Sequence, residues 1–188
     1  MDFDHYTDGS AAIATDLVNT FGTVPLRAAG HCDEPLGDPA AFLRAHGLDD
    51  TGVTPDDAPA LRDLADRLHA VFDADDPATA VRIINDLLAA NGAIPQITSH
   101  DAHDWHLHYV PRDGGSLAQL TVTAAMGLAA VLCTAGTGRF GHCDGIACRD
   151  VYIDTSRNNR RRFCTDGCAN RAHVTAHRAR QRTDQGSV

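Results

Sequence analysis

Residues 142–182 read HCDGIACRDVYIDTSRNNRRRFCTDGCANRAHVTAHRARQR and hold four of the six cysteines of the 188-residue chain. The four form two close pairs, Cys143 with Cys148 and Cys164 with Cys168, separated by fifteen residues. This arrangement is typical of tetrahedral zinc sites, because each tight turn supplies two thiolates. The alternative is four buried thiols without a metal, but a segment with so few large apolar side chains then has too little core to fold. The sequence therefore predicts one structural Zn²⁺ bound by these four cysteines.

The chain around the cysteines has the order of elements expected of a treble-clef-like zinc finger. We expect RDVYID (149–154) and RRRFC (160–164) to be paired strands, with a turn at 156–159. TDGCANRAHVTAHRARQR (165–182) is compatible with a helix, which places Cys168 in its first turn. His142 is an alternative metal ligand beside Cys143, although we expect its side chain to be exposed. Four cysteine ligands leave no open position on the metal, so a structural role is favoured.

Positive charge is concentrated in the same segment. Residues 139–182 hold ten arginines against four aspartates, whereas residues 1–138 hold 20 acidic residues against six arginines, and the chain has no lysine. Such an asymmetry is expected when one part of a protein meets a polyanion and the other does not. The candidate nucleic-acid contacts are Arg160, Arg161 and Arg162 before the helix, and Arg171, His177, Arg178, Gln181 and Arg182 on it.

Some arginines have a second explanation. A zinc ion with four thiolates carries a net charge of −2, which nearby arginines can neutralise, and Arg149 and Arg171 are the candidates. This explanation covers two or three arginines rather than ten, so nucleic-acid binding remains the favoured interpretation.

The rest of the chain reads as mainly helical. Helical periodicity and Asp-Pro or Thr-Pro starts predict helices within 10–21, 38–48, 54–74, 76–91 and 116–133. Alternating polar and apolar residues near Trp105, Leu107 and Tyr109 predict a strand that pairs with 94–99. The predicted fold class is thus mainly α with a small β-hairpin (α+β): a helical domain at 1–135, a hinge near 135–141, the zinc finger at 139–182 and a flexible tail at 183–188.

The finger segment resembles the CGNR zinc-finger family, named for the Cys-Gly-Asn-Arg run around its fourth cysteine, and ATDLVNT and PAAFLRAHGL resemble the ABATE domain that usually precedes that finger. The resemblance implies a bacterial transcription regulator whose finger binds DNA. It implies the same four cysteine ligands and a signature pair, Asn170 and Arg171. The family's glycine is Ala169 here; we expect a helical conformation, in which alanine is better than glycine by up to ~1 kcal/mol.

The other sequence features are less specific. The N-terminus lacks the pattern of a signal peptide and 120–136 reads as a buried helix, so we expect a cytoplasmic protein without a membrane partner. Cys32 and Cys133 are expected to be buried. Asp16 and Asn19 could line a ligand pocket. A cluster of histidines at 100, 103, 106 and 108 is better explained as a solvated polar face than as a second metal site.

Three functions are compatible with these features. The favoured one is a zinc-containing regulator that binds duplex DNA, with the helical domain binding a small-molecule effector or forming a homodimer. The second is an adaptor whose basic finger docks on an acidic protein surface, including its own helical domain. The third is an enzyme with a pocket in the helical domain, although no catalytic motif is found.

Overall fold

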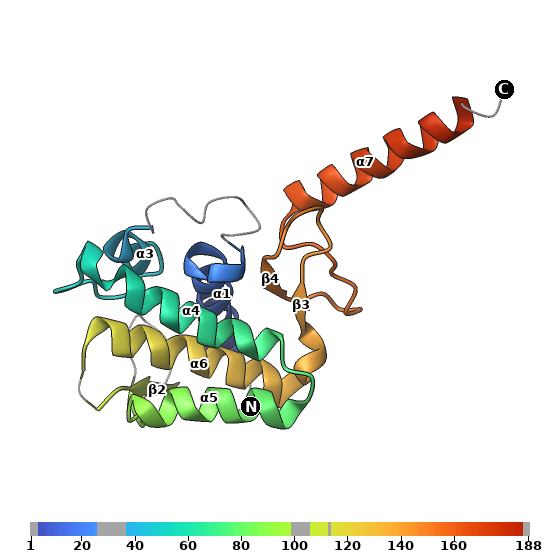
Figure 1. The fold of residues 1–188 in the computed structure, drawn as a ribbon. Coiled ribbons are helices and arrows are strands. Elements are labelled where there is room, and N and C mark those ends of the chain that lie inside the picture. Colours follow the sequence, from blue (N-terminus) through green and yellow to red (C-terminus); the bar gives the residue numbers. More distant parts are fainter. Residues whose placement is uncertain (1–3, 26–36, 99–105, 113, 186–188) are drawn as a thin grey trace.

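The computed structural model describes residues 4–25, 37–98, 106–112 and 114–185. Figure 1 shows helices packed side by side, a smaller unit at one end and a long helix leaving it. The helical domain contains α1 (Asp4–Phe21), α3 (Pro39–Ala45), the 3₁₀ turn η1 (Pro55–Asp57), α4 (Ala58–Phe72), α5 (Pro77–Ala90), β1 (Ile94–Thr98), β2 (His106–Val110) and α6 (Ser116–Ala135). The remaining elements are the 3₁₀ turn η2 (Thr137–Arg139), β3 (Phe140–His142), β4 (Val151–Ile153) and α7 (Asp166–Gln185). The predicted fold class is confirmed.

Local side-chain chemistry sets several helix starts where the sequence predicts them. The Asp38 carboxylate accepts a hydrogen bond from the Ala40 N–H at 3.0 Å, and the Asp76 carboxylate accepts one from the Thr79 N–H at 2.9 Å. Each aspartate precedes a proline at the first helical position, where the missing N–H costs nothing. By contrast, α1 begins at Asp4, before the predicted start at residue 10, so Ser10 is buried inside the helix.

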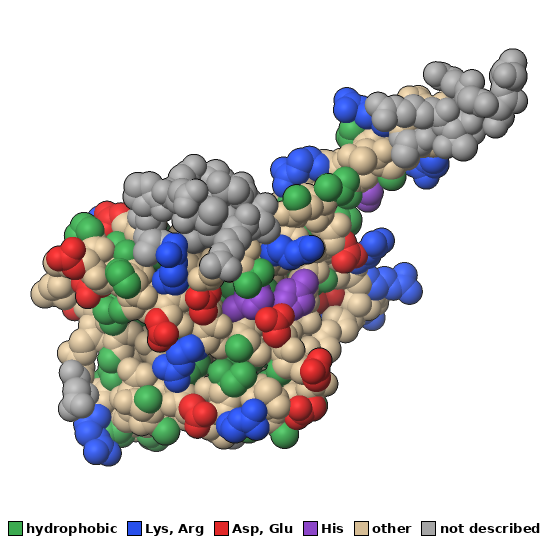
Figure 2. Space-filling model, in the orientation of Figure 1, with side chains coloured by type: hydrophobic (Ala, Val, Ile, Leu, Met, Phe, Trp, Pro, Cys, Tyr) green, Lys and Arg blue, Asp and Glu red, His purple; other side chains and the backbone are tan. Residues whose placement is uncertain are grey.

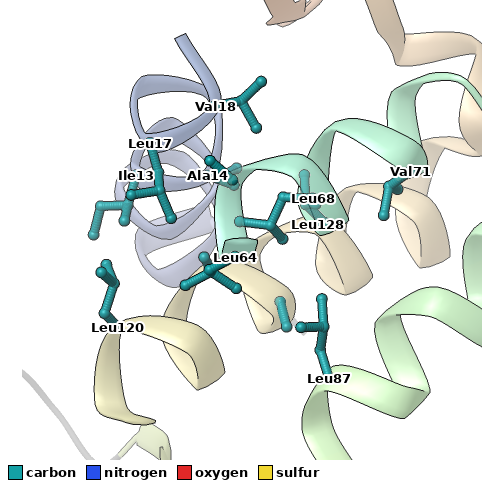
Figure 3. Close-up of a cluster of buried hydrophobic side chains, with 14 of the residues drawn as sticks. Ile13, Ala14, Leu17, Val18, Leu64, Leu68, Val71, Leu87, Leu120 and Leu128 are labelled. Atoms are coloured by element: carbon teal, nitrogen blue, oxygen red, sulfur yellow. The ribbon is translucent and has the colours of Figure 1, made fainter. Parts of the chain in front are cut away.

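The core of the helical domain lies between α1, α4, α5 and α6. Figure 3 shows Leu17 of α1, Leu68 of α4, Leu87 of α5 and Leu128 of α6 around this space. Helices α1 and α6 approach closely at Gly127, where an added Cβ would lie 2.4 Å from the Ala11 nitrogen. The absence of a side chain at this position is therefore what allows the two helices to pack so tightly.

Helix α6 is long and apolar enough, by length and composition, to cross a membrane, with a mean hydropathy of 1.7. In this fold it is the central helix of the core: half of its most apolar window is buried, and it packs against α1 and α5. Cys133 near its end is exposed, so the prediction that this thiol is buried was wrong. Cys32 lies outside the described residues.

The predicted hairpin of the helical domain is present. Strands β1 and β2 pair antiparallel, with Ile94 opposite Val110 and Thr98 opposite His106. The Gln119 side chain of α6 donates a hydrogen bond to the Tyr109 carbonyl at 3.2 Å, which fastens the hairpin to the core. Gly92 has a φ of +57°, which glycine tolerates, and lies in the turn after α5, where the predicted helix 76–91 ends.

The strand pairing in the finger differs from the prediction. Strand β4 pairs antiparallel with β3, which precedes the cysteines, and residues 160–164 form an irregular segment. Gly141 explains the observed pairing, because a Cβ there would lie 2.6–2.7 Å from the ring atoms of Tyr152 on β4. The turn at 156–159 is present as predicted, but it leads into a loop rather than a second strand.

Strand β4 joins the finger to the helical domain. Val151 and Ile153 belong to the same buried cluster as the helices, and Phe140 packs against it. The Asn19 side chain of α1 donates a hydrogen bond to the Val151 carbonyl at 3.0 Å and accepts one from the Val151 N–H at 2.8 Å. The Asn19 amide thus occupies the position that a neighbouring strand would take, on the side of β4 away from β3. The segment predicted as a hinge, 135–141, contains η2 and most of β3, and Phe140 packs against the core.

Candidate metal centre and basic surface

The two cysteine pairs meet in one cluster, as predicted. The turn after β3 supplies Cys143 and Cys148, the segment before α7 supplies Cys164, and the first turn of α7 supplies Cys168. The Cys164 sulfur lies 3.7 Å from that of Cys148 and 3.6 Å from that of Cys168. Thiolates bound to one tetrahedral zinc ion at the usual bond length are about 3.8 Å apart. The four thiols therefore have the donor type and spacing that zinc requires.

The surroundings of the cluster orient its sulfurs. The backbone N–H groups of Gly145 and Cys164 donate to the Cys143 sulfur at 3.4 and 3.3 Å. Gly145 packs against the cluster, where a Cβ would lie 3.2 Å from that same sulfur. These N–H groups stabilise negative charge on the sulfur and orient it.

The pKa values of the thiols show why a cation is needed. Burial raises the pKa of Cys148 to about 12, and burial together with the neighbouring Asp150 carboxylate also raises that of Cys164. Burial also acts to raise the pKa of Cys168, but hydrogen bonds from Cys164 and Cys148 outweigh it and lower the value. The protein alone thus cannot keep all four sulfurs ionised at neutral pH. A zinc ion deprotonates the thiols that coordinate it, so metal binding releases protons and completes the fold of the finger.

A buried carboxylate holds the loop between β4 and α7. Asp154 accepts hydrogen bonds from the Ser156 N–H at 2.8 Å and the Arg161 N–H at 2.7 Å. Burial acts to raise the pKa of Asp154, but these hydrogen bonds outweigh it and hold the pKa below its usual value. The sequence DTSRNNRRR thus encodes a fixed loop, in which Asn159 adopts a φ of +49°.

The arginine of the loop with the most internal contacts is Arg161. Its guanidinium donates to the carbonyl oxygens of Ile153 at 3.2 Å, Phe163 at 2.9 Å and Cys164, and it lies 5.1 Å from the centre of the Tyr152 ring. It therefore holds the loop in place, and only its remaining N–H groups are available for a phosphate.

The neighbouring arginines are more open. Arg160 is exposed, and Arg162 pairs with Asp144 at 2.7 Å while its side chain stays largely in solvent. Together with Thr165 and His173 they line an open hollow of about 720 Å³ beside the start of α7. This hollow offers a positively charged surface without a deep cavity.

Helix α7 carries the other predicted contacts. Arg171 donates to the Cys168 sulfur at 2.8 Å, as expected if it neutralises the metal centre. His177, Arg178 and Gln181 are exposed, and the Arg182 side chain lies outside what the structure describes. Ala169 is helical, with its N–H donating to the Thr165 carbonyl at 3.1 Å, which confirms that no glycine is needed there. Figure 1 shows α7 running away from the helical domain, so its exposed side chains are free of that domain.

The two residues considered for a ligand pocket have other partners. Asn19 binds the Val151 backbone, and the exposed Asp16 carboxylate lies 3.1 Å from the His46 ring nitrogen Nε2. His100 and His103 lie outside the described residues. A second cluster with metal-ligand chemistry forms instead from His69, Asp73 and His142, which sequence reasoning missed because the first two lie about 70 residues from the third.

Fold and cluster together define a class: a helical domain followed by a four-cysteine zinc finger with a basic helix. Two family models match the chain in this order. The ABATE model, described as "Putative stress-induced transcription regulator", matches residues 11–135, and the CGNR zinc finger model matches residues 139–181. The chain belongs to the ABATE family and carries a CGNR zinc finger, which confirms the resemblance seen in the sequence. No curated protein matches the sequence.

Proposed function

We propose that this protein is a cytoplasmic bacterial transcription regulator that binds duplex DNA through its zinc finger. The observation that carries the proposal is the placement of α7, an exposed helix with arginines that extends away from the acidic helical domain. An α-helix fits the DNA major groove, where an arginine guanidinium can donate two hydrogen bonds to the exposed edge of a guanine base. The description of the ABATE family as a transcription regulator supports the same function.

The arrangement of charge supports DNA binding in a specific way. Acidic side chains are spread over the helical domain, whereas basic ones dominate the finger and α7 (Figure 2). A uniformly acidic protein is repelled by DNA, so binding requires the basic face to point away from the acidic part. The direction of α7 meets this requirement. It also weakens the alternative that the finger docks on its own helical domain.

The arginines divide into two groups by their contacts. Arg161 and Arg171 are used largely inside the finger, for the loop and for the Cys168 sulfur. Arg160, Arg162 and Arg178 are exposed. We assign Arg160 and Arg162 to backbone phosphates, because they flank the hollow beside α7. We assign Arg178, with His177, Gln181 and Arg182 near it on the same helix, to base edges.

The helical domain is the candidate for regulation. We propose that it binds a small-molecule effector or forms a homodimer, as expected of a regulator whose DNA contacts are confined to the finger. Palindromic enrichment in a DNA selection would reveal a homodimer, because a two-fold protein selects two half-sites at fixed spacing.

The test is a selection from random duplexes with the zinc-loaded full chain, followed by a salt titration on the best site. We expect an enriched sequence and an affinity that falls steeply with salt, with a slope of about −0.9 per neutralised phosphate. Binding to acidic proteins with no enrichment of any duplex would favour the adaptor. Absence of DNA binding even at low salt would refute the proposal.

A further inference from the structure

A second cluster of ligand-type side chains lies where the helical domain meets the finger. His69 belongs to the last turn of α4, Asp73 follows it by four residues, and His142 ends β3. One nitrogen or oxygen from each lies within 4.8 Å of the others. Figure 2 shows histidine and acidic side chains together in this region of the surface.

The Asp73 carboxylate lies between the two imidazoles. Its Oδ2 is 2.9 Å from His69 Nδ1, and its Oδ1 is 3.1 Å from His142 Nε2. Ligand atoms of histidine and aspartate bound to one tetrahedral zinc ion are about 3.3 Å apart. The observed separations are close to that value, so a small rotation of the carboxylate makes room for an ion.

The local electrostatics favour a cation. Asp73 is the C-cap of α4, where the carbonyl ends of the helix already create negative potential, so its carboxylate is unfavourably placed without a positive partner. The Phe72 carbonyl oxygen adds to this, at 3.3 Å from His142 Nε2. The cluster is thus a place where negative charge gathers beside two imidazoles.

Burial holds the His69 side chain of this cluster in a fixed position. Its side chain is only 8% exposed, whereas those of Asp73 and His142 are 56% and 41% exposed. Its Nε2 is buried and has no hydrogen-bond partner among the described residues. Packing therefore fixes the His69 ring with Nδ1 toward Asp73, while the other two ligands stay accessible from solvent. A metal ion can enter without unfolding the core.

We propose that His69, Asp73 and His142 bind a divalent transition metal ion of the zinc type. Two imidazoles and one carboxylate suit Zn²⁺ and its neighbours in the first transition row better than Mg²⁺ or Ca²⁺, which prefer oxygen ligands. Three protein ligands leave an open coordination position facing solvent. This site is therefore weaker and more exchangeable than the four-cysteine site.

The proposed ion would link the two parts of the protein. His69 and Asp73 come from the helical domain, and His142 directly precedes the zinc ligand Cys143. An ion held by all three fixes β3 on the end of α4 and thereby the orientation of the finger.

The test is metal stoichiometry of the full chain by equilibrium dialysis against buffered free Zn²⁺ with elemental analysis. We expect two ions per chain at high free Zn²⁺, and one after mild chelation. The variants D73N and H142A should keep the first ion and lose affinity for the second by more than the ~10–100-fold typical of removing an outer partner of a metal ligand. Both changed side chains are solvent-accessible, so the variants are expected to fold.

Two controls separate this site from other histidines and acids. His177→Ala on α7 and Asp75→Asn after α4 change exposed residues outside the cluster and should leave both ions in place. Titration of Co²⁺ into protein that retains zinc on its cysteines gives an independent readout, because binding at the second site adds d–d bands without thiolate charge-transfer bands. A wild-type chain that saturates at one ion, or a second ion retained by both D73N and H142A, would overturn the proposal.

Discussion

Replacing Asn19 by alanine should destabilise the whole protein, because this side chain joins the helical domain to the finger. The Asn19 amide exchanges two hydrogen bonds with the Val151 backbone, at 3.0 and 2.8 Å, and Val151 is only 1% exposed. The substitution leaves one backbone donor and one acceptor without partners, at a cost of about 1–3 kcal/mol each when buried. Asn19 itself is half-buried, so water reaches part of the site, and we expect a total loss of about 2–4 kcal/mol.

This loss is large enough to measure on the zinc-loaded chain. For a protein of this size it corresponds to a fall in melting temperature of about 4–16 °C. Asn19→Asp should cost less backbone pairing, because the carboxylate still accepts from the Val151 N–H but no longer donates to its carbonyl. Asn85→Ala, at an exposed position of α5, is the matched control and should change the free energy of unfolding by less than about 0.5 kcal/mol.

Hydrogen exchange locates the effect. The Val151 amide should lose protection in Asn19→Ala more than amides of α5 do. If the free energy of unfolding of Asn19→Ala equals that of Asn85→Ala, and the Val151 amide keeps its protection, the proposed joint between α1 and β4 is wrong.

Four further variants test other parts of the structure. Cys164→Ser should abolish the binding of the ion that survives mild chelation, and it should unfold the finger while the helical domain stays folded but less stable, as measured by elemental analysis after chelation and by circular dichroism. One equivalent of zinc retained after chelation would contradict the ligand assignment. The double change of Arg160 and Arg162 to alanine should weaken DNA binding alike for all duplexes and flatten its salt dependence, without lowering the melting temperature. Arg161→Ala should instead lower the melting temperature, because this side chain holds the loop. A lower melting temperature in the double variant and an unchanged one in Arg161→Ala would contradict this division of roles. Gly127→Ala should cost about 1–3 kcal/mol by overpacking the contact of α1 with α6, and unchanged stability in urea denaturation would show that the helices can separate there freely.

The sequence predicts best those features that depend on local order. The spacing of the four cysteines predicts that they form one cluster with metal-ligand chemistry, because both pairs lie in tight turns whose geometry is set by neighbouring residues. Helix starts such as Asp38-Pro39 and Asp76-Pro77 are predicted for the same reason. In each case the interacting atoms are separated by only a few residues.

The features that were missed depend on long-range pairing. Residues 160–164 have the composition of a strand, but β4 pairs with β3, since Gly141 gives room for the Tyr152 ring and Asp154 ties the following loop to its own end of β4. Asn19 looks like a pocket residue in the sequence, and nothing near it indicates that its partner is Val151. These contacts follow from how the helical domain and the finger pack together.

The charge pattern alone also overstates the number of arginines free for DNA. All ten arginines of 139–182 look equivalent in the sequence, but Arg139 donates to the carbonyls of Asp154 and Ser156, and Arg171 donates to the Cys168 sulfur. Only a structure separates arginines that hold the finger together from those that face solvent.

The proposed function requires that the zinc-dependent basic finger give this protein its affinity for duplex DNA. The most direct measurement is the salt dependence of binding to one selected duplex, made in parallel on the zinc-loaded chain and on the chain stripped of metal under reducing conditions. We predict tight binding with a steep negative dependence of log K on log salt for the zinc-loaded chain, and loss of specific binding once the metal is removed. Equal binding by both forms, or no binding by the zinc-loaded chain at low salt, would contradict the proposed function.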